Sequence, residues 1–349
     1  MPSNIFPATL VRFPAPTQGR SAAFFLAAEE FVARELPEGN YAFFWQLGPT
    51  CVFGRHQDTR AELDVGFCKA HGVELVRRKS GGGTISAAED NIMVSLVTGS
   101  GSVEDIFEGF ARSVANGLRT LGVPTRVSGR NDICLDDGRK ICGGAFYHLP
   151  QRNIVHCTML YDTQMELMRG CLTPARAKLE SKGVKSVESR IGLLKDFLPF
   201  GVAQLREELA KILCTDEVCL TPQQVARIEE IERPYHDEAY IFGSKNYVTD
   251  KHSAQRIEGC GRIEFRLSLH EGKIRNVDVA GDYFETSCQP ASEAFSQALC
   301  GLPLDAETIA RAIRTHQPHR TIRGLSEEKA IALLTVNISN FRKLSLPQE

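Results

Sequence analysis

One stretch stands out, Arg77-Arg78-Lys79-Ser80-Gly81-Gly82-Gly83-Thr84, because it joins a basic cluster to three successive glycines. It lies between two segments predicted as strands, residues 73–78 and 91–98. Successive glycines let backbone N–H groups curl around an oxyanion, and guanidinium groups can form paired hydrogen bonds with a phosphate or carboxylate. The stretch is neither a P-loop nor the dinucleotide-binding G-x-G-x-x-G. Taken by itself, it fits a nucleotide-phosphate site and a flexible, solvated turn equally well.

A second polar group follows on a predicted meander of three strands within residues 131–160. It comprises Arg130-Asn131-Asp132 on the first strand, Lys140 on the second, and Gly143-Gly144 just after it. A lysine beside glycines can reach a ligand that lies against the backbone, where its charge would stabilise a carboxylate attacking phosphorus. Taken alone, Lys140 also fits a solvated edge lysine, and His156 on the third strand fits a packed or surface histidine.

Together these segments resemble the lipoate-protein ligase family, whose ATP-dependent members share a catalytic fold with biotin ligases and octanoyl transferases. The resemblance rests on ordered motifs along most of the chain. These are R-R-x-S-G-G-G at residues 77–83, G-R-N-D at 129–132, K-x-S-G-x-A at 140–145, His156 and Thr158 of H-H-G-T, and L-x-P…K-G…S-V-x-S-R at 172–190.

This resemblance implies an α+β fold with two domains. Residues 1–250 would form a catalytic domain of the biotin/lipoate ligase type, with a mixed or antiparallel sheet packed with helices. Residues 251–349 would form a small α+β accessory domain, as found in ligases that make their own adenylate. Simple octanoyl transferases resemble the catalytic domain alone, so this C-terminal region favours the ATP-dependent enzyme. A length of 349 residues also suggests roughly two domains.

The resemblance further implies a reaction in two steps. Lipoate and Mg-ATP give lipoyl-adenylate and pyrophosphate, and the lipoyl group then moves to a lysine of an acceptor domain. Lys140 would be the catalytic residue and contact both lipoate and ATP. The family's ATP or adenylate contacts map onto Arg78, Ser80, Gly83, Thr84, Ile85, Ser86, Asn91, Asn131, Asp132 and Lys140. Its lipoate contacts map onto Lys140, Gly143, Ala145 and His156.

The implied cofactors and partners follow from the same chemistry. No metal site of the protein's own is expected, but Mg²⁺ would arrive with ATP, and Asp132 is a candidate carboxylate for it. Acceptors would be the lipoyl domains of 2-oxoacid dehydrogenase E2 subunits and the glycine cleavage H protein. An apolar slot for the lipoyl tail could include Trp45, Val52 and Phe53, which fit a plain core equally well.

Composition excludes several other classes. The 41 Lys and Arg and 43 Asp and Glu residues give a net charge of −2, so no overall basic field favours nucleic acid or an anionic membrane. The longest apolar runs are far shorter than the roughly 20 residues of a membrane helix, and no secretory signal is recognised. The 11 cysteines contain no C-x-x-C pair and fit reduced thiols. We therefore expect a cytoplasmic protein.

Departures from the family motifs leave two alternatives open. Ser86-Ala87-Ala88 stands where the family has an aromatic residue, His and Asp, and Val155 and Cys157 replace the first His and the Gly of H-H-G-T. One alternative is a cysteine-dependent octanoyl or lipoyl transferase that uses Cys142 or Cys157 as the nucleophile. The other is a lipoate-binding protein with reduced catalysis.

The helix and strand pattern gives further expectations. Ser21 and Ser102 should each begin an amphipathic helix, and Thr173-Pro174 and Thr221-Pro222 should each offer an N-cap followed by proline. A further helix is expected over residues 202–213. In the C-terminal region, strands at 263–269 and 273–279 should pair through a turn at Glu271-Gly272, followed by helices near 290–299, 306–315 and 326–334.

Overall fold

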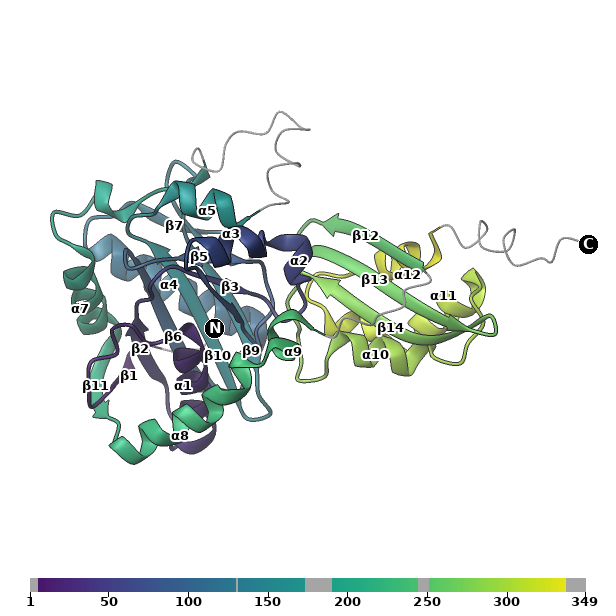
Figure 1. Ribbon diagram of the computed structural model, residues 1–349, viewed down its shortest axis with the longest axis horizontal. Helices are drawn as coiled ribbons and strands as arrows, with labels where there is room; N and C mark the ends of the chain where they lie inside the picture. Colours follow the sequence, from purple (N-terminus) through teal and green to yellow (C-terminus); the bar gives the residue numbers. More distant parts are fainter. Residues whose placement is uncertain (1–5, 130, 173–189, 244–250, 337–349) are drawn as a thin grey trace, which may run out of the picture. The chain divides into compact units, whose positions relative to one another are not determined.

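The computed structural model describes residues 6–129, 131–172, 190–243 and 251–336. The chain divides into two compact units, Met1–Gly243 and Ser244–Glu349 (Figure 1). The predicted N-cap at Thr173 and the family-like motifs within residues 173–189 lie outside the described residues, as does Arg130. In the described part of the chain, no helix is long and apolar enough to cross a membrane.

The first unit is built on a mixed sheet of eight strands in the order β11-β1-β2-β6-β10-β9-β8-β7. β1 pairs in parallel with both β2 and β11, whereas every pairing from β2 through β6, β10, β9 and β8 to β7 is antiparallel. The strands are β1 (Ala8–Arg12), β2 (Tyr41–Trp45), β6 (Asn91–Gly99), β7 (Thr125–Ser128), β8 (Asp132–Leu135), β9 (Lys140–His148), β10 (Arg152–Leu160) and β11 (Cys214–Cys219). The predicted α+β class and the predicted meander are confirmed.

Four helices pack on this sheet or on a helix that covers it, and each begins or lies where the sequence predicts. Ser21 caps α1 (Ala22–Glu35), Ser102 caps α4 (Val103–Thr120), and Thr221 forms a capping box at α8 (Pro222–Glu232). The fourth, α7 (Val202–Leu213), packs on α4, where Leu209 would lie 3.3 Å from a Cβ added to Gly117. Side-chain oxygens at the caps satisfy N–H groups that a helix end otherwise leaves unpaired.

Strand register shows which helices lie on which face. Gly144 of β9 faces α4, because a Cβ added to it would lie 3.0 Å from Phe107. Its neighbour Ala145 must point the other way, and Ala145 is paired with His156, which contacts Glu29 of α1. Therefore α1 and α4 lie on opposite faces of the sheet (Figure 1). The face under α1 carries the predicted lipoate residues.

A second, three-stranded sheet in the order β4-β3-β5 carries the glycine-rich stretch. β3 (Thr50–Phe53) is parallel to β4 (Glu74–Arg77) and antiparallel to β5 (Ile85–Ala87). Short helices surround it: α2 (Thr59–Glu62), α3 (Val65–Ala70), α5 (Met165–Cys171), α9 (Glu238–Phe242) and the 3₁₀ helix η3 (Arg233–His236). Two cores result, one beneath α1 and one around β3, α3 and α5.

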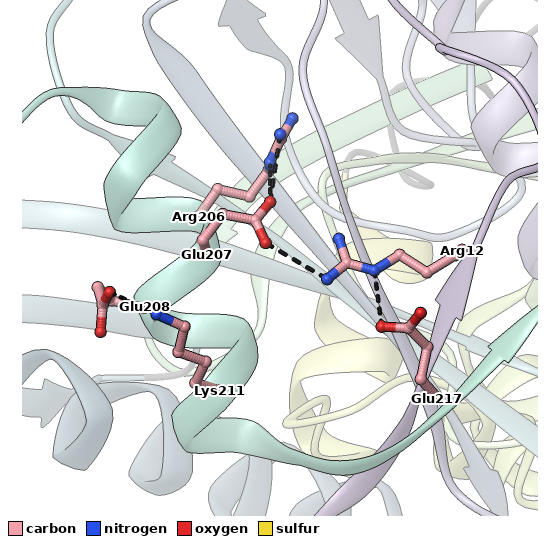
Figure 2. A network of polar contacts seen from close by, with 6 residues as sticks. All are labelled: Arg12, Arg206, Glu207, Glu208, Lys211 and Glu217. Atoms are coloured by element: carbon pink, nitrogen blue, oxygen red, sulfur yellow. Dashed lines mark hydrogen bonds and ion pairs between the residues drawn. The ribbon is translucent and has the colours of Figure 1, made fainter.

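A polar network crosses the parallel end of the large sheet. Arg12 of β1 forms ion pairs with Glu217 of β11 at 3.0 Å and with Glu207 of α7 at 3.3 Å (Figure 2). Glu207 also pairs with Arg206, and its neighbour Glu208 pairs with Lys211 at 2.9 Å. These side chains are partly exposed, so we attribute the position of β11 mainly to its backbone ladder with β1.

The second unit is an antiparallel sheet, β12-β13-β14, packed with three helices. Its elements are β12 (Lys251–Ile257), β13 (Gly261–His270), β14 (Lys273–Gly281), α10 (Ala291–Leu299), α11 (Ala306–His316), the 3₁₀ helix η4 (Pro318–Thr321) and α12 (Glu327–Thr335). Phe265 of β13 and Phe295 of α10 meet edge to face at 4.8 Å in its separate core. The predicted hairpin through Glu271-Gly272, both at positive φ, and the three predicted helices are confirmed.

Candidate active site

The glycine-rich loop, residues 78–84, connects β4 to β5 and thereby passes the end of β3, which lies between them. Gly54 follows β3 at this end. A Cβ added to Gly54 would lie 2.1 Å from the carbonyl oxygen of Gly82, and Gly82 itself has a φ of +88°. Two glycines therefore allow the loop backbone to lie directly against the strand end.

Arg78 holds the loop from inside. Its Nη2 donates to the carbonyls of Gly81 at 2.6 Å and Gly83 at 2.8 Å, Nη1 donates to Val52, and Nε donates to the Ser80 hydroxyl at 2.9 Å. The side chain is buried, and burial lowers its pKa to about 10. All three guanidinium nitrogens thus contact protein atoms, so the observed contacts of Arg78 shape the loop.

A line of hydrogen bonds ties this loop to the large sheet and to α1. The Ser80 hydroxyl lies 2.9 Å from Nε2 of His156, and Nδ1 of His156 lies 2.9 Å from a carboxylate oxygen of Glu29. Because a carboxylate only accepts, Nδ1 of His156 donates to Glu29, and Nε2 is the ring nitrogen that meets the Ser80 hydroxyl. Ser95 donates to Glu29 at 2.5 Å and accepts from the Trp45 indole at 2.8 Å. The orientations of Ser80 and His156 are therefore fixed.

A second buried carboxylate of α1 anchors the loop at Lys79, the residue before Ser80. Glu30 of α1 forms an ion pair with Lys79 at 2.6 Å and accepts from the hydroxyl of Tyr235 at 2.5 Å. Sequence analysis missed both Glu29 and Glu30. The available signal was the pair of adjacent carboxylates within the apolar helix sequence AAFFLAAEEFVA, because a charged pair on a buried helix needs partners.

Lys140, the predicted catalytic residue, lies at the start of β9. Its ammonium is 2.7 Å from a carboxylate oxygen of Asp132, and both side chains are partly exposed. A Cβ added to Gly143 would lie 2.7 Å from the same ammonium, so the lysine side chain passes directly over that glycine. The G-x-A pattern after Lys140 thus has a steric reason: a larger residue at position 143 would displace the ammonium.

Register brings Lys140 and the glycine-rich loop to the same face. Gly143, beneath Lys140, and Ala145, paired with His156, are two residues apart on β9 and point the same way. Their Cα atoms are therefore about 7 Å apart, at roughly 3.4 Å per strand residue. Since Ser80 contacts His156, the structure brings together Ser80, Lys140, Gly143, Ala145 and His156 from the predicted set.

The other predicted residues mainly brace the backbone. The Asn131 amide donates to the Gly144 carbonyl at 2.6 Å, and Asn91 accepts from Ala88 at 2.9 Å while donating to Asp162. Thr84 donates to Gln57, which also accepts from Gly54 and was missed by sequence analysis. Ile85 and Ser86 lie on β5, opposite Val52 and Cys51.

Two sets of residues considered from sequence lie inside the protein. Cys142 and Cys157 are neighbouring buried thiols, and their mutual hydrogen bond and burial raise the pKa of Cys142. Because the thiolate is the nucleophilic form, this environment opposes nucleophilic catalysis. Trp45 stacks on Phe25 at 4.7 Å, and it belongs with Val52 to the core beneath α1, so both are packing residues in this structure.

A cavity of about 820 Å³ lies elsewhere in the first unit, between the segment at residues 10–19 and α7. Phe44, Gln46, Arg206 and Glu207 are among the residues that line it. Among the described residues at its wall, none belongs to the predicted site. The geometry around Lys140 and the glycine-rich loop, rather than this cavity, therefore locates the candidate active site.

Comparison with known proteins shows the family of this chain. Residues 21–214 match the family model of the lipoyl protein ligase A/B catalytic domain, and residues 249–334 match that of the bacterial lipoate protein ligase C-terminus. Lipoate-protein ligase LplJ of Bacillus subtilis is 31% identical over 271 residues, which cover 74% of this chain and 81% of the relative. Lipoate–protein ligase 1 of Staphylococcus aureus is 27% identical over 319 residues, covering 89% and 95%.

Solved structures share the fold. The structure of P. falciparum LipL1 in complex with lipoate has a TM-score of 0.73 at 17% identity and covers 94% of this chain and 99% of its own. A bipartite lipoate protein ligase from Thermoplasma acidophilum, described together with its E2 lipoyl domain, has a TM-score of 0.60 at 22% identity, covering 70% and 99%. At these identities the likeness establishes the fold alone.

Proposed function

The chain belongs to the lipoate-protein ligase family, and from this premise we propose that it activates lipoate with ATP as lipoyl-AMP and transfers the lipoyl group to a lysine of a lipoyl-carrier protein. In the first step the lipoate carboxylate attacks the α-phosphorus of ATP, and pyrophosphate leaves. In the second, the carrier lysine attacks the lipoyl carbonyl, and AMP leaves. In both steps, negative charge develops or moves at the reacting carboxyl group of lipoate.

The observation that carries this proposal is the ammonium of Lys140 above Gly143, on the same sheet face as the glycine-rich loop. Two anions must approach each other in the first step, and a fixed positive charge lowers the cost of their approach. Lys140 is partly exposed and is held by Asp132 at 2.7 Å, so it is oriented yet within reach of a ligand. We assign it to the lipoate carboxylate and the α-phosphate.

Residues around Lys140 supply the remaining binding groups in this proposal. Ser80 and the loop that Arg78 shapes face the adenylate, while Gly143, Ala145 and His156 form the floor under lipoate. Gly83, Thr84, Ile85, Ser86, Asn91 and Asn131 are assigned to the adenylate side as well. The hydrogen bonds that His156 forms with Glu29 and Ser80 support this by fixing the orientation of the imidazole.

Mg²⁺ fits this site through Asp132. That ion usually keeps several waters and binds through one or two carboxylates together with substrate phosphates. Asp132 is a single, partly exposed carboxylate beside the ammonium that would meet the phosphate. We propose that Asp132 holds the ion, which would supply charge neutralisation of the phosphates, while Lys140 orients the reacting carboxylate.

We propose that the acceptors are E2 lipoyl domains and the glycine cleavage H protein. Support for the first is the similarity to the Thermoplasma acidophilum ligase described with its E2 lipoyl domain. We also place the protein in the cytoplasm, a proposal supported by its 11 free thiols, which fit a reducing compartment.

The test is the intact mass of a purified apo lipoyl domain after incubation with the protein, lipoate and Mg²⁺, with and without ATP. The proposal predicts a lipoyl adduct only when ATP is present. An adduct that forms without ATP from an acyl-thioester donor would instead move the chemistry to a cysteine. Tight lipoate binding in calorimetry without any adduct would leave a binding protein and contradict the proposal.

A cysteine control sharpens this test. Replacing both Cys142 and Cys157 with alanine removes the thiols that a transferase mechanism would need. Because the pKa of Cys142 is raised by its hydrogen bond to Cys157 and by burial, we expect the double variant to keep ATP-dependent transfer. Loss of transfer in a variant with an unchanged melting temperature would contradict this expectation.

A further inference from the structure

Three thiols from distant parts of the sequence meet in the core around β3, α3 and α5. Cys51 of β3, Cys68 of α3 and Cys171 of α5 are each 0% exposed, and their sulfur atoms all lie within 4.8 Å of one another. Among the residues that the structure describes, no His, Asp or Glu ligand atom joins this group. None of the three cysteines belongs to the predicted site, and the proposed ligase reaction does not use them.

Tight packing positions the three sulfur atoms. A Cβ added to Gly170 of α5 would lie 2.0 Å from the Phe67 ring of α3, so these two helices are in close contact. The Asp64 amide also donates to the carbonyl of Cys171 at 3.0 Å. Because these contacts hold the α3 and α5 backbones against each other, the thiols meet without any need for a ligand to gather them.

The spacing of the sulfur atoms matches metal coordination. An equilateral triangle with 4.8 Å sides has its centre about 2.8 Å from each corner, whereas a zinc–thiolate bond is about 2.3 Å long. Each sulfur would therefore move inward by at most about 0.5 Å to bind an ion at the centre, a distance within the reach of a small χ1 rotation.

We propose that Cys51, Cys68 and Cys171 form a buried tris-thiolate site for one closed-shell thiophilic ion, Cu⁺ or Zn²⁺. Thiolates are the ligands that select these soft ions, and carboxylate-preferring Mg²⁺ has no partner here. On binding, three sulfur–metal bonds form, three S–H bonds break and three protons leave to solvent. The site then carries a net charge of −2 with Cu⁺ or −1 with Zn²⁺.

Without metal, the thiols of Cys51 and Cys68 are held in the protonated form. Burial raises the pKa of Cys51, and burial followed by the hydrogen bond with Cys171 raises that of Cys68 to about 12. Metal binding must displace these protons, so affinity should rise with pH. Competing thiol chemistry is suppressed for the same reason, since alkylation and oxidation need a thiolate.

The test uses the full chain, reduced and stripped with a chelator, then titrated anaerobically with Zn²⁺ or Cu⁺. We expect native mass spectrometry to show one equivalent of one of these ions retained against a competing chelator. X-ray absorption then distinguishes the ions' geometries: three sulfur neighbours for Cu⁺, and three sulfurs with one added light ligand for Zn²⁺. Failure of the folded chain to retain either ion would overturn the proposal.

Single-residue variants locate the ion. Cys68→Ala and Cys171→Ala should weaken retention at least about 100-fold, whereas Cys142→Ala, which alters the other buried thiol cluster, should leave it unchanged. Full retention in Cys68→Ala or Cys171→Ala would contradict the assignment.

Should a variant fail to fold, the ion-dependent rise in melting temperature of the unmodified chain remains a test, because an ion that binds only the native state stabilises it. Neither measurement depends on ligase activity, so the two proposals fail independently.

Discussion

Lys140 and Lys195 are the same residue type in nearly the same surroundings, which makes them a matched pair. Lys140 lies 2.7 Å from Asp132 with side-chain exposures of 41% and 32%, and Lys195 lies 2.8 Å from Asp162 with 42% and 32%. They differ in position, since Lys140 alone passes over Gly143. Any difference between their variants therefore reports on the site rather than on loss of a surface ion pair.

We expect Lys140→Met to lower lipoate-dependent exchange of pyrophosphate into ATP at least about 100-fold, because it removes the charge that stabilises the approaching anions. Lys195→Met should keep exchange within about twofold. Both variants should melt within a few degrees of the unmodified chain, since exposed ion pairs stabilise by about 1 kcal/mol or less. Full exchange activity in Lys140→Met would refute the assigned role.

Among the elements, the loop between β4 and β5 depends on how closely it lies against the end of β3. Gly54→Ala places a Cβ 2.1 Å from the Gly82 carbonyl, so the loop must shift. We expect kcat/KM to fall about 100-fold, the order of loss for a reacting group misplaced by about 1 Å. Gly201→Ala is the control, because a Cβ there meets nothing within 4 Å at a φ of −78°. Equal activity in the two variants would contradict the role of this contact.

Arg77, the last residue of β4, links this strand to α9. Its guanidinium donates to the carbonyls of Arg55 at 2.8 Å and Ile241 at 2.8 Å, to the Thr59 hydroxyl at 2.7 Å, and stacks over the Phe53 ring. A lysine ammonium cannot fill this planar array of acceptors. We expect Arg77→Lys to lower the free energy of unfolding by about 3 kcal/mol and to raise the KM for ATP.

A second buried arginine provides the control for that change. Arg152 also donates to backbone carbonyls, those of Pro37 at 3.1 Å and Gly39 at 2.7 Å, but it lies four residues before His156 on β10, about 14 Å along the strand. Arg152→Lys should destabilise the fold while leaving the KM for ATP unchanged. Urea unfolding and steady-state kinetics measure both effects, and an equal rise in KM would show that Arg77 acts through general stability alone.

Local signals explain which elements were predicted. Ser21, Ser102 and Thr221 are N-caps whose hydrogen bonds involve neighbouring residues, so the sequence contains all the information needed for each helix start. By contrast, β11 has the polar sequence CTDEVC and is largely exposed, and it becomes a strand only through parallel pairing with β1. Such pairing between distant segments leaves no local pattern.

The residues of the candidate site divide in the same way, into those that a local motif predicts and those that are distant in the sequence. Motif residues such as Lys140 and Ser80 could be assigned because a resemblance fixed their order along the chain. Glu29 and Gln57 lie outside those motifs, and they contact His156 and Thr84 across 127 and 27 residues respectively. Only the folded chain reveals such partners. Arg78 shows the converse, because a motif assigned it to the nucleotide, whereas its observed contacts hold the loop.

Considered as a whole molecule, the chain is two units with separate cores, and the second holds an unusual lysine. Lys251 of β12 is 5% exposed, and its ammonium donates to the carbonyl of Leu334 near the end of α12 at 3.1 Å. Burial lowers the pKa of Lys251 to about 8, from 10.5. The charged form of Lys251 is thus less favourable in the native second unit than in the unfolded chain, despite the helix C-terminus that it contacts.

This shift predicts how stability depends on pH. Between about pH 8 and 10.5 the unfolded chain binds the Lys251 proton and the native chain does not, so the free energy of unfolding rises with pH. Lys251→Met lacks this contribution and removes the buried charge. The variant should therefore exceed the unmodified chain in stability by up to about 3 kcal/mol at pH 7, with the difference fading towards pH 10.5. Thermal unfolding at both pH values measures this difference in stability. Thiols that titrate near pH 9 affect both chains equally, so their contribution cancels from the difference. A difference that stays constant with pH would show that Lys251 is charged in the native protein throughout this range, and that its contact with Leu334 outweighs burial.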